Sequence, residues 1–175
     1  MISTKPIYII GFMGSGKTTI GKLLAQKLDF RFVDLDKMIE EYEGKTIPAL
    51  FELKTEKGFR ILEKKYLELT TQFQKTVISC GGGTPCFFDN INIINEKGIS
   101  LYLEMNVAAL QVRLKNSKTV RPLLINKTDA ELKTFIENKL AERQPFYKQA
   151  MLTFNALNAK SEEGINSIIG LLSQL

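Results

Sequence analysis

Short apolar runs and amphipathic stretches alternate along the whole of this chain. The apolar runs have the length of β-strands and span residues 7–10, 30–33, 76–79, 99–103 and 152–154. In the stretches between them, apolar residues recur at intervals of three and four, which is typical of helices with one buried face. We therefore expect an α/β fold in which one five-stranded parallel sheet is flanked by helices on both faces.

The helical stretches carry buried stripes, and several have clear ends. The stripes consist of Ile20, Leu23, Leu24 and Leu28; Phe59, Leu62, Tyr66 and Leu69; Val107, Leu110 and Leu114; Leu132, Phe135, Ile136 and Leu140; and Ile165, Ile168, Ile169 and Leu172. A short helix over residues 37–43 is expected to end at Gly44, and a longer helical region extends from Thr46 to Thr71. Thr128 and Glu131 form a capping box at the start of a further helix.

The first strand runs directly into the segment Gly11-Phe12-Met13-Gly14-Ser15-Gly16-Lys17-Thr18. This segment fits the phosphate-loop pattern G-x-x-x-x-G-K-[ST]. Its glycines allow a sharp turn that aims backbone N–H groups at phosphate oxygens, and the start of the next helix adds positive potential. We expect Lys17 to reach the β- and γ-phosphates and the Thr18 hydroxyl to bind Mg²⁺. A glycine-rich turn without a ligand is the alternative, but the flanking strand and helix favour a nucleotide site.

Two acids, Asp34 and Asp36, follow the second strand. Ligands of parallel sheets bind beyond the carboxyl ends of the strands, where the phosphate loop also lies. One carboxylate can hold Mg²⁺ through water while the other accepts a hydroxyl proton. The alternative is that Asp36 caps the helix over residues 37–43. No aspartate ends the third strand, which strengthens Asp34 as the acid on the metal side.

Two arginines and a run of glycines are candidates for binding an acidic substrate. Arg60 precedes Glu63 by three residues and forms either a surface ion pair or a clamp that Glu63 orients. The run Gly81-Gly82-Gly83 follows the third strand and is either a flexible turn or a place where a ligand touches backbone. Arg143 falls on the buried face of its helix, so its charge needs a structural acid or a substrate carboxylate.

Composition narrows the chemistry further. The chain contains no histidine, which excludes Ser-His-Asp and Cys-His catalysis and most zinc sites. Cys80 and Cys86 are expected to be reduced structural thiols. The net charge of +5 suits an anionic ligand, but the lysines are scattered and predict no nucleic-acid partner. No apolar run approaches the roughly 18 residues of a membrane span, and no signal peptide is apparent.

Six segments in this order and spacing resemble the shikimate kinase family over essentially the whole chain: GFMGSGKTTIGKLLA, FVDLD, GFRILE, ISCGGGTP, VRPLL and ERQPFY. The resemblance implies a three-layer P-loop kinase fold related to the nucleoside monophosphate kinases. It implies phosphorylation of the 3-hydroxyl of shikimate by ATP with Mg²⁺, giving shikimate 3-phosphate and ADP, in the chorismate route to aromatic amino acids. We accordingly expect a cytoplasmic, monomeric, single-domain enzyme over residues 1–175 that acts on small molecules and binds neither nucleic acid nor membrane.

The resemblance also implies a role for each matching residue. The implied catalytic residues are Asp36 as the base together with Lys17 and Arg121. The implied nucleotide site consists of Gly14, Ser15, Gly16, Lys17, Thr18, Thr19 and Arg121, with Thr18 and Asp34 on the metal side. The implied shikimate site consists of Asp36, Arg60, Gly81, Gly82, Gly83 and Arg143. The basic segment over residues 115–124, closed by a proline, is expected to be a mobile lid.

The chain departs from the family pattern at a few positions. Thr55 stands where many members have a glycine. Leu114 and Lys115 stand near the place where some members carry an arginine beside the adenine, and Arg113 is adjacent. The residues around 155–160 are too weakly marked to assign adenine contacts.

Other nucleotide-dependent functions remain as alternatives. Asn126-Lys127-Thr128-Asp129 fits the guanine-binding NKxD signature of GTPase switches. However, no D-x-x-G motif lies between it and the phosphate loop, and a helix cap at Thr128 explains the segment more simply. A kinase of another small acid or sugar, such as gluconate, and a nucleotide-binding scaffold without activity are the remaining alternatives.

Overall fold

The five predicted strands form one parallel sheet in the computed structural model, which describes residues 3–117, 124 and 126–175. The strands are β1 (Ile7–Ile10), β2 (Arg31–Asp34), β3 (Thr76–Ser79), β4 (Ile99–Glu104) and β5 (Leu152–Asn155). Their order across the sheet is β2-β3-β1-β4-β5, and all four pairings are parallel. All strands therefore present their carboxyl ends at one edge of the sheet.

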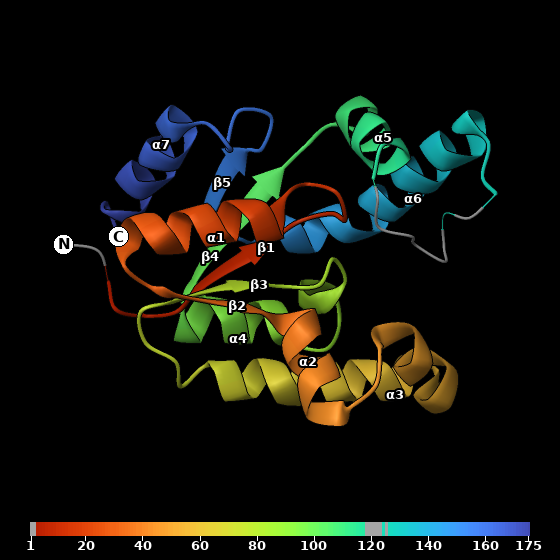
Figure 1. Cartoon of the computed structure of the whole chain (residues 1–175), viewed down its shortest axis with the longest axis horizontal. Helices are drawn as coiled ribbons and strands as arrows, with labels where there is room; N and C mark the ends of the chain where they lie inside the picture. The colour runs from red at the N-terminus through yellow and green to blue at the C-terminus, as the bar shows by residue number, and fades with distance from the viewer. Residues whose placement is uncertain (1–2, 118–123, 125) are drawn as a thin grey trace.

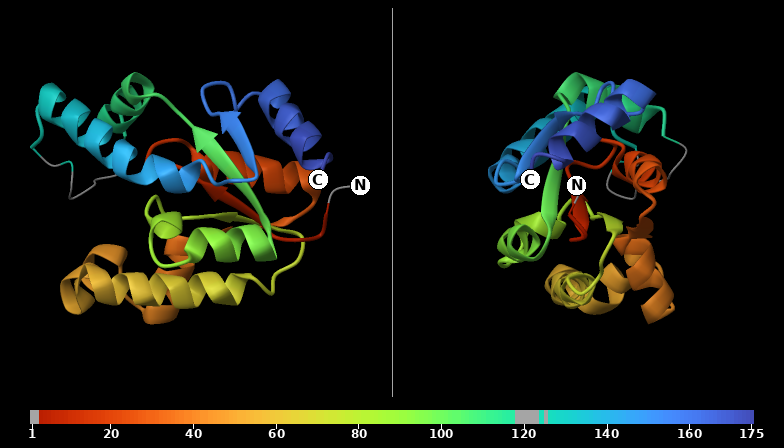
Figure 2. Two further views of the ribbon diagram at one scale, coloured as in Figure 1. Left: turned by 180° about the vertical axis from the view of Figure 1, so that it is seen from behind. Right: turned by 90° about the vertical axis from the view of Figure 1, so that its left-hand side faces the viewer.

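Helices cover both faces of this sheet (Figures 1 and 2). They are α1 (Lys17–Leu28), α2 (Leu35–Glu43), α3 (Ile47–Thr70), α4 (Asn90–Lys97), α5 (Val107–Lys115), α6 (Asp129–Tyr147) and α7 (Glu162–Leu172), with a 3₁₀ turn η1 (Thr84–Cys86). α1 and α7 pack together on one face, whereas α4 lies on the other. The three-layer α/β architecture expected from the sequence is confirmed. None of the helices in the described ranges combines the length and the apolarity needed to cross a bilayer.

The core surrounds the central strand β1, whose four residues are fully buried. Most of the predicted helical stripes face this core, including Ile20, Tyr66 and Ile136. Two predicted stripe positions do not: Leu23 is 36% exposed and Leu69 is 48% exposed. Both lie at the border of their stripes, where a 3.6-residue period carries the side chain away from the sheet.

The sequence predicted helix boundaries well where caps are strong and poorly elsewhere. Gly44 ends α2 in a left-handed conformation, and the capping box of Thr128 and Glu131 opens α6, as expected. The alternative in which Asp36 caps α2 is wrong, because Asp34 is the cap and accepts a hydrogen bond from the Lys37 N–H. Neither α4 nor η1 was predicted, because both are short and carry weak patterns.

The long α3 is interrupted by a kink at Thr55, whose φ of 60° and ψ of 171° are not helical. This conformation is nearly exclusive to glycine, because a side chain there crowds the backbone. Many members of the family that the sequence resembles have glycine at this position. The kink lets Phe51 stack on Phe59 with ring centroids 4.3 Å apart, so the first part of α3 folds toward Arg60.

Candidate active site

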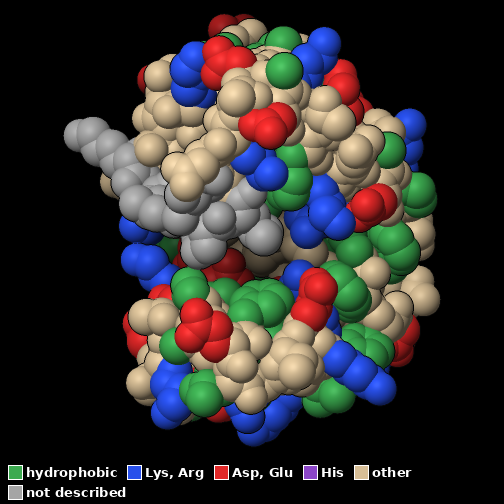
Figure 3. Space-filling model, turned by 90° about the vertical axis from the view of Figure 1, so that its right-hand side faces the viewer, with side chains coloured by type: hydrophobic (Ala, Val, Ile, Leu, Met, Phe, Trp, Pro, Cys, Tyr) green, Lys and Arg blue, Asp and Glu red, His purple; other side chains and the backbone are tan. Residues whose placement is uncertain are grey.

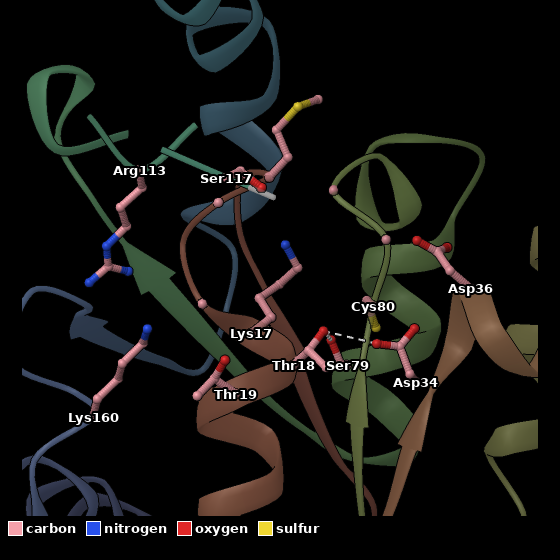
Figure 4. A pocket seen from close by; sticks show the side chains of 15 residues that line it. Lys17, Thr18, Thr19, Asp34, Asp36, Ser79, Cys80, Arg113, Ser117 and Lys160 are labelled. Atoms are coloured by element: carbon pink, nitrogen blue, oxygen red, sulfur yellow. Dashed lines mark hydrogen bonds between the residues drawn. The ribbon is translucent and has the colours of Figure 1, made fainter. Parts of the chain in front are cut away.

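A cavity of about 650 Å³ opens at the carboxyl ends of the strands. The phosphate loop, Asp34, Asp36 and the first part of the glycine run line it. Figure 3 shows a hollow on this side of the molecule, with basic and acidic side chains around its rim. Figure 4 shows Lys17 near the middle, with Arg113 and Lys160 on one side and both aspartates on the other. The cavity therefore has a basic end and an acidic end.

The phosphate loop has the conformation its glycines require. Gly14 and Gly16 have φ angles of 84° and 99°, and α1 begins directly afterwards at Lys17. The Lys17 ammonium group donates to the carbonyl oxygens of Gly11 at 2.9 Å and Phe12 at 3.0 Å. The lysine therefore lies across the mouth of its own loop, next to the helix N-terminus that attracts phosphate.

Thr18 and Asp34 meet in the structure, as the metal-side expectation requires. The Thr18 hydroxyl donates to a carboxylate oxygen of Asp34 at 2.9 Å, and it lies 3.4 Å from the Ser79 hydroxyl. These three groups come from α1 and from the ends of β2 and β3. All are hard oxygen donors of the kind that Mg²⁺ prefers, and Mg²⁺ commonly takes its other ligands from water and phosphate.

Asp36 lies on the first turn of α2 and faces the start of the glycine run. The pKa of its carboxyl group is raised from 3.8 to about 6, mainly by burial and also by the nearby carboxylates of Glu63 and Asp34, while Lys17 and Arg60 oppose the shift. A carboxylate with a raised pKa near a nucleotide site suits proton acceptance close to neutral pH.

Charged side chains lie close to each of the three glycines, on the side where a Cβ would project. A side chain at Gly81 would lie 2.9 Å from an Asp36 oxygen and 3.0 Å from a Glu63 oxygen. At Gly83 it would lie 2.7 Å from a nitrogen of Arg60, and at Gly82 3.2 Å from a nitrogen of Arg143. A Cβ at these positions would crowd the neighbouring carboxylate and guanidinium groups, which gives a packing reason for the glycines.

Arg60 forms a buried ion pair, not a surface one. Its Nη1 donates to Glu63 at 2.9 Å, and the side chains are 10% and 1% exposed. The other oxygen of Glu63 accepts a 2.6 Å hydrogen bond from the Thr84 hydroxyl, just after the glycine run. Glu63 thus joins α3 to the glycine run and fixes one corner of the Arg60 guanidinium.

Arg143 approaches the same glycine run from α6. Its Nη1 atom is buried and has no hydrogen-bond partner within the described part of the chain. Burial is the main cause that raises the pKa of the nearby Cys86 thiol to about 11, while the Arg143 and Arg60 guanidinium groups oppose the shift. A buried donor without a partner has a substantial desolvation cost, which an anionic ligand would offset.

Comparison with known proteins gives the family. A sequence model described as Shikimate kinase matches residues 13–173. The chain belongs to the shikimate kinase family. It is 44% identical to a shikimate kinase of Phocaeicola vulgatus over 95% of both chains, and 43% identical to that of Bacteroides thetaiotaomicron over 97% of both.

Solved structures of shikimate kinases have the same fold. The structure from Bacteroides thetaiotaomicron matches with a TM-score of 0.90 at 42% identity, covering 97% of both chains. The Acinetobacter baumannii enzyme, solved in complex with shikimate, matches with a TM-score of 0.87 at 32% identity over 97% of this chain and 93% of that chain. A gluconokinase from Sinorhizobium meliloti, at 13% identity and a TM-score of 0.59, shares the fold alone.

The structure adds two residues that sequence reasoning did not assign. Arg113 donates to the Ser15 carbonyl oxygen at 3.1 Å and to the Ala156 carbonyl oxygen at 3.4 Å, and it lines the cavity with Lys160. The position of Arg113 beside the expected adenine site was a usable signal. Lys160 lies in the segment over residues 155–160, which the sequence marked too weakly to assign, and it reaches the cavity through the loop before α7.

Arg121 and most of the predicted lid lie outside the described residues. The described ends of that segment are Lys115–Ser117 and Leu124, and Ser117 lines the cavity. The NKxD signature has a structural explanation, since Thr128 caps α6 and Asp129 forms an ion pair with Lys115 at 2.7 Å.

Proposed function

We propose that this protein transfers the γ-phosphoryl group of ATP to the 3-hydroxyl of shikimate, giving shikimate 3-phosphate and ADP, in the chorismate route to aromatic amino acids. The observation that carries the proposal is the convergence of Arg60 and Arg143 on one glycine run beside Asp36. This arrangement provides cations for a carboxylate and a base for a hydroxyl on the same small substrate. Family membership supports the assignment.

The nucleotide phosphates occupy the loop at Gly14, Ser15, Gly16, Lys17, Thr18 and Thr19. Backbone N–H groups of the loop and the ammonium group of Lys17 bind the phosphate oxygens and neutralise charge that develops during transfer. Arg113 and Lys160 lie at the basic end of the cavity, and the rest of the nucleotide is proposed to extend toward them from the phosphate loop. Arg121 is proposed to bind the transferred group from the lid.

Mg²⁺ is proposed to bind beside Thr18 and Asp34. The Thr18 hydroxyl contacts one Asp34 oxygen, and the remaining Asp34 oxygen accepts from the Lys37 N–H at 3.3 Å, which fixes the carboxylate in place. When bound, the ion supplies positive charge for the β- and γ-phosphate oxygens. The Thr18 hydroxyl and the Asp34 carboxylate orient it.

Shikimate is proposed to lie along the glycine run, with its carboxylate between the two guanidinium groups. Each arginine can donate two parallel hydrogen bonds to a carboxylate, which fixes the ring as well as binding it. Asp36 then accepts the proton of the attacking 3-hydroxyl as the oxygen–phosphorus bond forms and ADP leaves. A closed lid excludes water from the transferred group.

We further propose that residues 1–175 act as one domain and as a cytoplasmic monomer, with residues 115–124 as the mobile lid. The partners are shikimate and ATP, without nucleic acid or membrane.

An ADP-release assay tests the proposed function directly. ATP is combined in turn with shikimate, quinate and gluconate, and GTP replaces ATP as a control. Shikimate is expected to give the highest kcat/KM by at least two orders of magnitude. A higher kcat/KM for gluconate than for shikimate would show that gluconate is the substrate. Hydrolysis of GTP without any added acceptor would indicate a GTPase in place of a kinase.

A further inference from the structure

The guanidinium group of Arg60 is surrounded by three aromatic rings. Its central carbon lies 4.2 Å from the ring centroid of Phe87, 5.3 Å from that of Phe59 and 5.6 Å from that of Phe51. Phe51 and Phe59 belong to α3, the helix that carries Arg60. Phe87, which has the closest ring, comes from the segment after η1 and reaches Arg60 from a different part of the chain.

The polar contacts of Arg60 leave its orientation only partly fixed. Nη1 pairs with the buried Glu63, but the Nη2 partner, Glu56 at 3.4 Å, has a side chain that is 64% exposed. Nε is buried and has no hydrogen-bond partner among the residues that the structure describes. One firm ion pair permits the guanidinium plane to rotate about that contact. An aromatic ring against the face of the plane restricts this rotation, and the attraction between cation and ring favours the stacked position.

Phe87 is itself held firmly in place. The Cys86 N–H donates to the Gly83 carbonyl oxygen at 2.9 Å, and the Asn90 N–H donates to the Phe87 carbonyl oxygen at 3.3 Å. The next residue, Phe88, has a φ of 52°, which is rare for a large aromatic residue, and its side chain is 53% exposed. The left-handed turn at Phe88 sends this side chain to solvent while its neighbour Phe87 faces Arg60. Surrounding structure must hold such a strained residue.

We infer that Phe87 is a positioning residue for shikimate binding, because its ring holds Arg60 in the orientation that receives the substrate carboxylate. This inference rests on the proposed function. Without the ring, Arg60 samples other orientations, and binding must restrict them again. Immobilising one flexible side chain corresponds to a loss of roughly two- to tenfold in affinity.

The test replaces Phe87 by leucine in the full-length protein. Phe87→Leu keeps an apolar side chain and removes the π face, and Phe87→Met is a second variant that fills more of the space. Isothermal titration is expected to show two- to tenfold weaker shikimate binding, with the KM for ATP and kcat unchanged. Phe87→Tyr keeps the ring face and is expected to bind shikimate as the parent does. Phe88→Leu is the matched control, since it makes the same change one residue along and is expected to leave shikimate affinity unchanged.

A shikimate analogue with an uncharged alcohol in place of the carboxylate separates an effect on Arg60 from general damage. The analogue is expected to bind the parent and Phe87→Leu equally, because its binding does not depend on the guanidinium orientation. Unchanged shikimate affinity in a folded Phe87→Leu variant, or equal losses for shikimate and the analogue, would overturn the inference. Failure of the parent protein to phosphorylate shikimate would overturn the proposed function instead, and this is measured before any variant is compared.

Discussion

The hydroxyl of Tyr147 donates a 2.5 Å hydrogen bond to the carbonyl oxygen of Gly82, joining the end of α6 to the middle of the glycine run. Tyr147 is fully buried and stacks on Tyr102 with ring centroids 5.1 Å apart. Burial raises the pKa of its hydroxyl, and the nearby Arg143 opposes that shift. The residue therefore connects two parts of the proposed shikimate site, the glycine run and the helix that carries Arg143.

Tyr147→Phe is expected to weaken shikimate binding severalfold while ATP binding is retained. The change removes one buried hydrogen bond and leaves the Gly82 carbonyl oxygen without its partner, which costs about 1–3 kcal/mol of folding free energy. Tyr102→Phe is the control, since it removes a hydroxyl from the same stacked pair and leaves the bond to Gly82 intact. Equal shikimate affinities and equal unfolding free energies for the two variants would show that the Tyr147–Gly82 bond has no special role.

Thr55→Gly is expected to stabilise the protein by about 1 kcal/mol, because Thr55 occupies a conformation that glycine adopts freely. The expected gain in the free energy of unfolding is the backbone strain that glycine relieves, minus the entropic cost of ordering the more flexible glycine on folding. Lys54→Gly, one residue earlier in a helical conformation, is the control and is expected to destabilise by about 1 kcal/mol. Urea unfolding of the three proteins measures both effects. Destabilisation by both glycines would show that Thr55 is not strained.

The activity is expected to depend on ionisation of Asp36. With the pKa of this carboxyl group near 6, kcat/KM for shikimate should rise with pH through about 6 and then level off. Asp36→Asn is expected to remove nearly all turnover. A rate that is independent of pH between 5 and 7, or an Asn variant with near-parental kcat, would exclude Asp36 as the base.

The raised pKa of Asp36 also predicts how the free energy of unfolding depends on pH. The folded pKa of about 6 lies above the usual 3.8, so between these values the folded state binds more protons than the unfolded state. Stability from this group therefore falls as pH rises from about 4 to about 6. Asp36→Asn, which carries no charge, is expected to be more stable than the parent at pH 7 and to lose this part of the pH dependence. Urea unfolding at pH 4 and pH 7 measures both.

Lys17 is expected to act on phosphate and not on folding. Lys17→Met keeps most of the apolar stem and removes the charge, so turnover should fall by about a hundredfold or more with little change in melting temperature. Lys22→Met is the matched control, because Lys22 is an exposed lysine of the same helix α1. Near-parental turnover in Lys17→Met would contradict the phosphate-loop assignment.

The features that the sequence predicted well are those encoded by neighbouring residues. The phosphate loop requires glycines and a lysine at fixed spacing, and each strand is a continuous apolar run, so local pattern was sufficient. The meeting of Thr18 and Asp34 followed from one general rule, that parallel strands present their carboxyl ends together.

The features that the sequence did not predict depend on packing between distant segments. Glu63 was assigned only to Arg60, yet it also accepts from Thr84, a contact that requires α3 to pack against η1. Lys160 and Phe87 reach their sites through turns whose direction no periodic pattern encodes. Aspartate is a good helix N-cap, so the sequence alone did not decide between Asp34 and Asp36. Asp34 is the cap in the structure, because its backbone is extended at the end of β2 and its side chain accepts from the Lys37 N–H.

The central claim is that Arg60 and Arg143 bind one carboxylate of the substrate. The most direct test measures the affinities of two ligands, with and without that carboxylate, for the parent and for the two arginine variants. Isothermal titration of shikimate and of its uncharged alcohol analogue is performed on the parent, Arg60→Ala and Arg143→Ala. Each substitution is expected to weaken shikimate binding by at least about tenfold, since a charge-assisted hydrogen bond contributes about 1.5–3 kcal/mol. The analogue should bind the parent weakly and be nearly indifferent to either substitution. An analogue that binds the parent as tightly as shikimate does would contradict the claim.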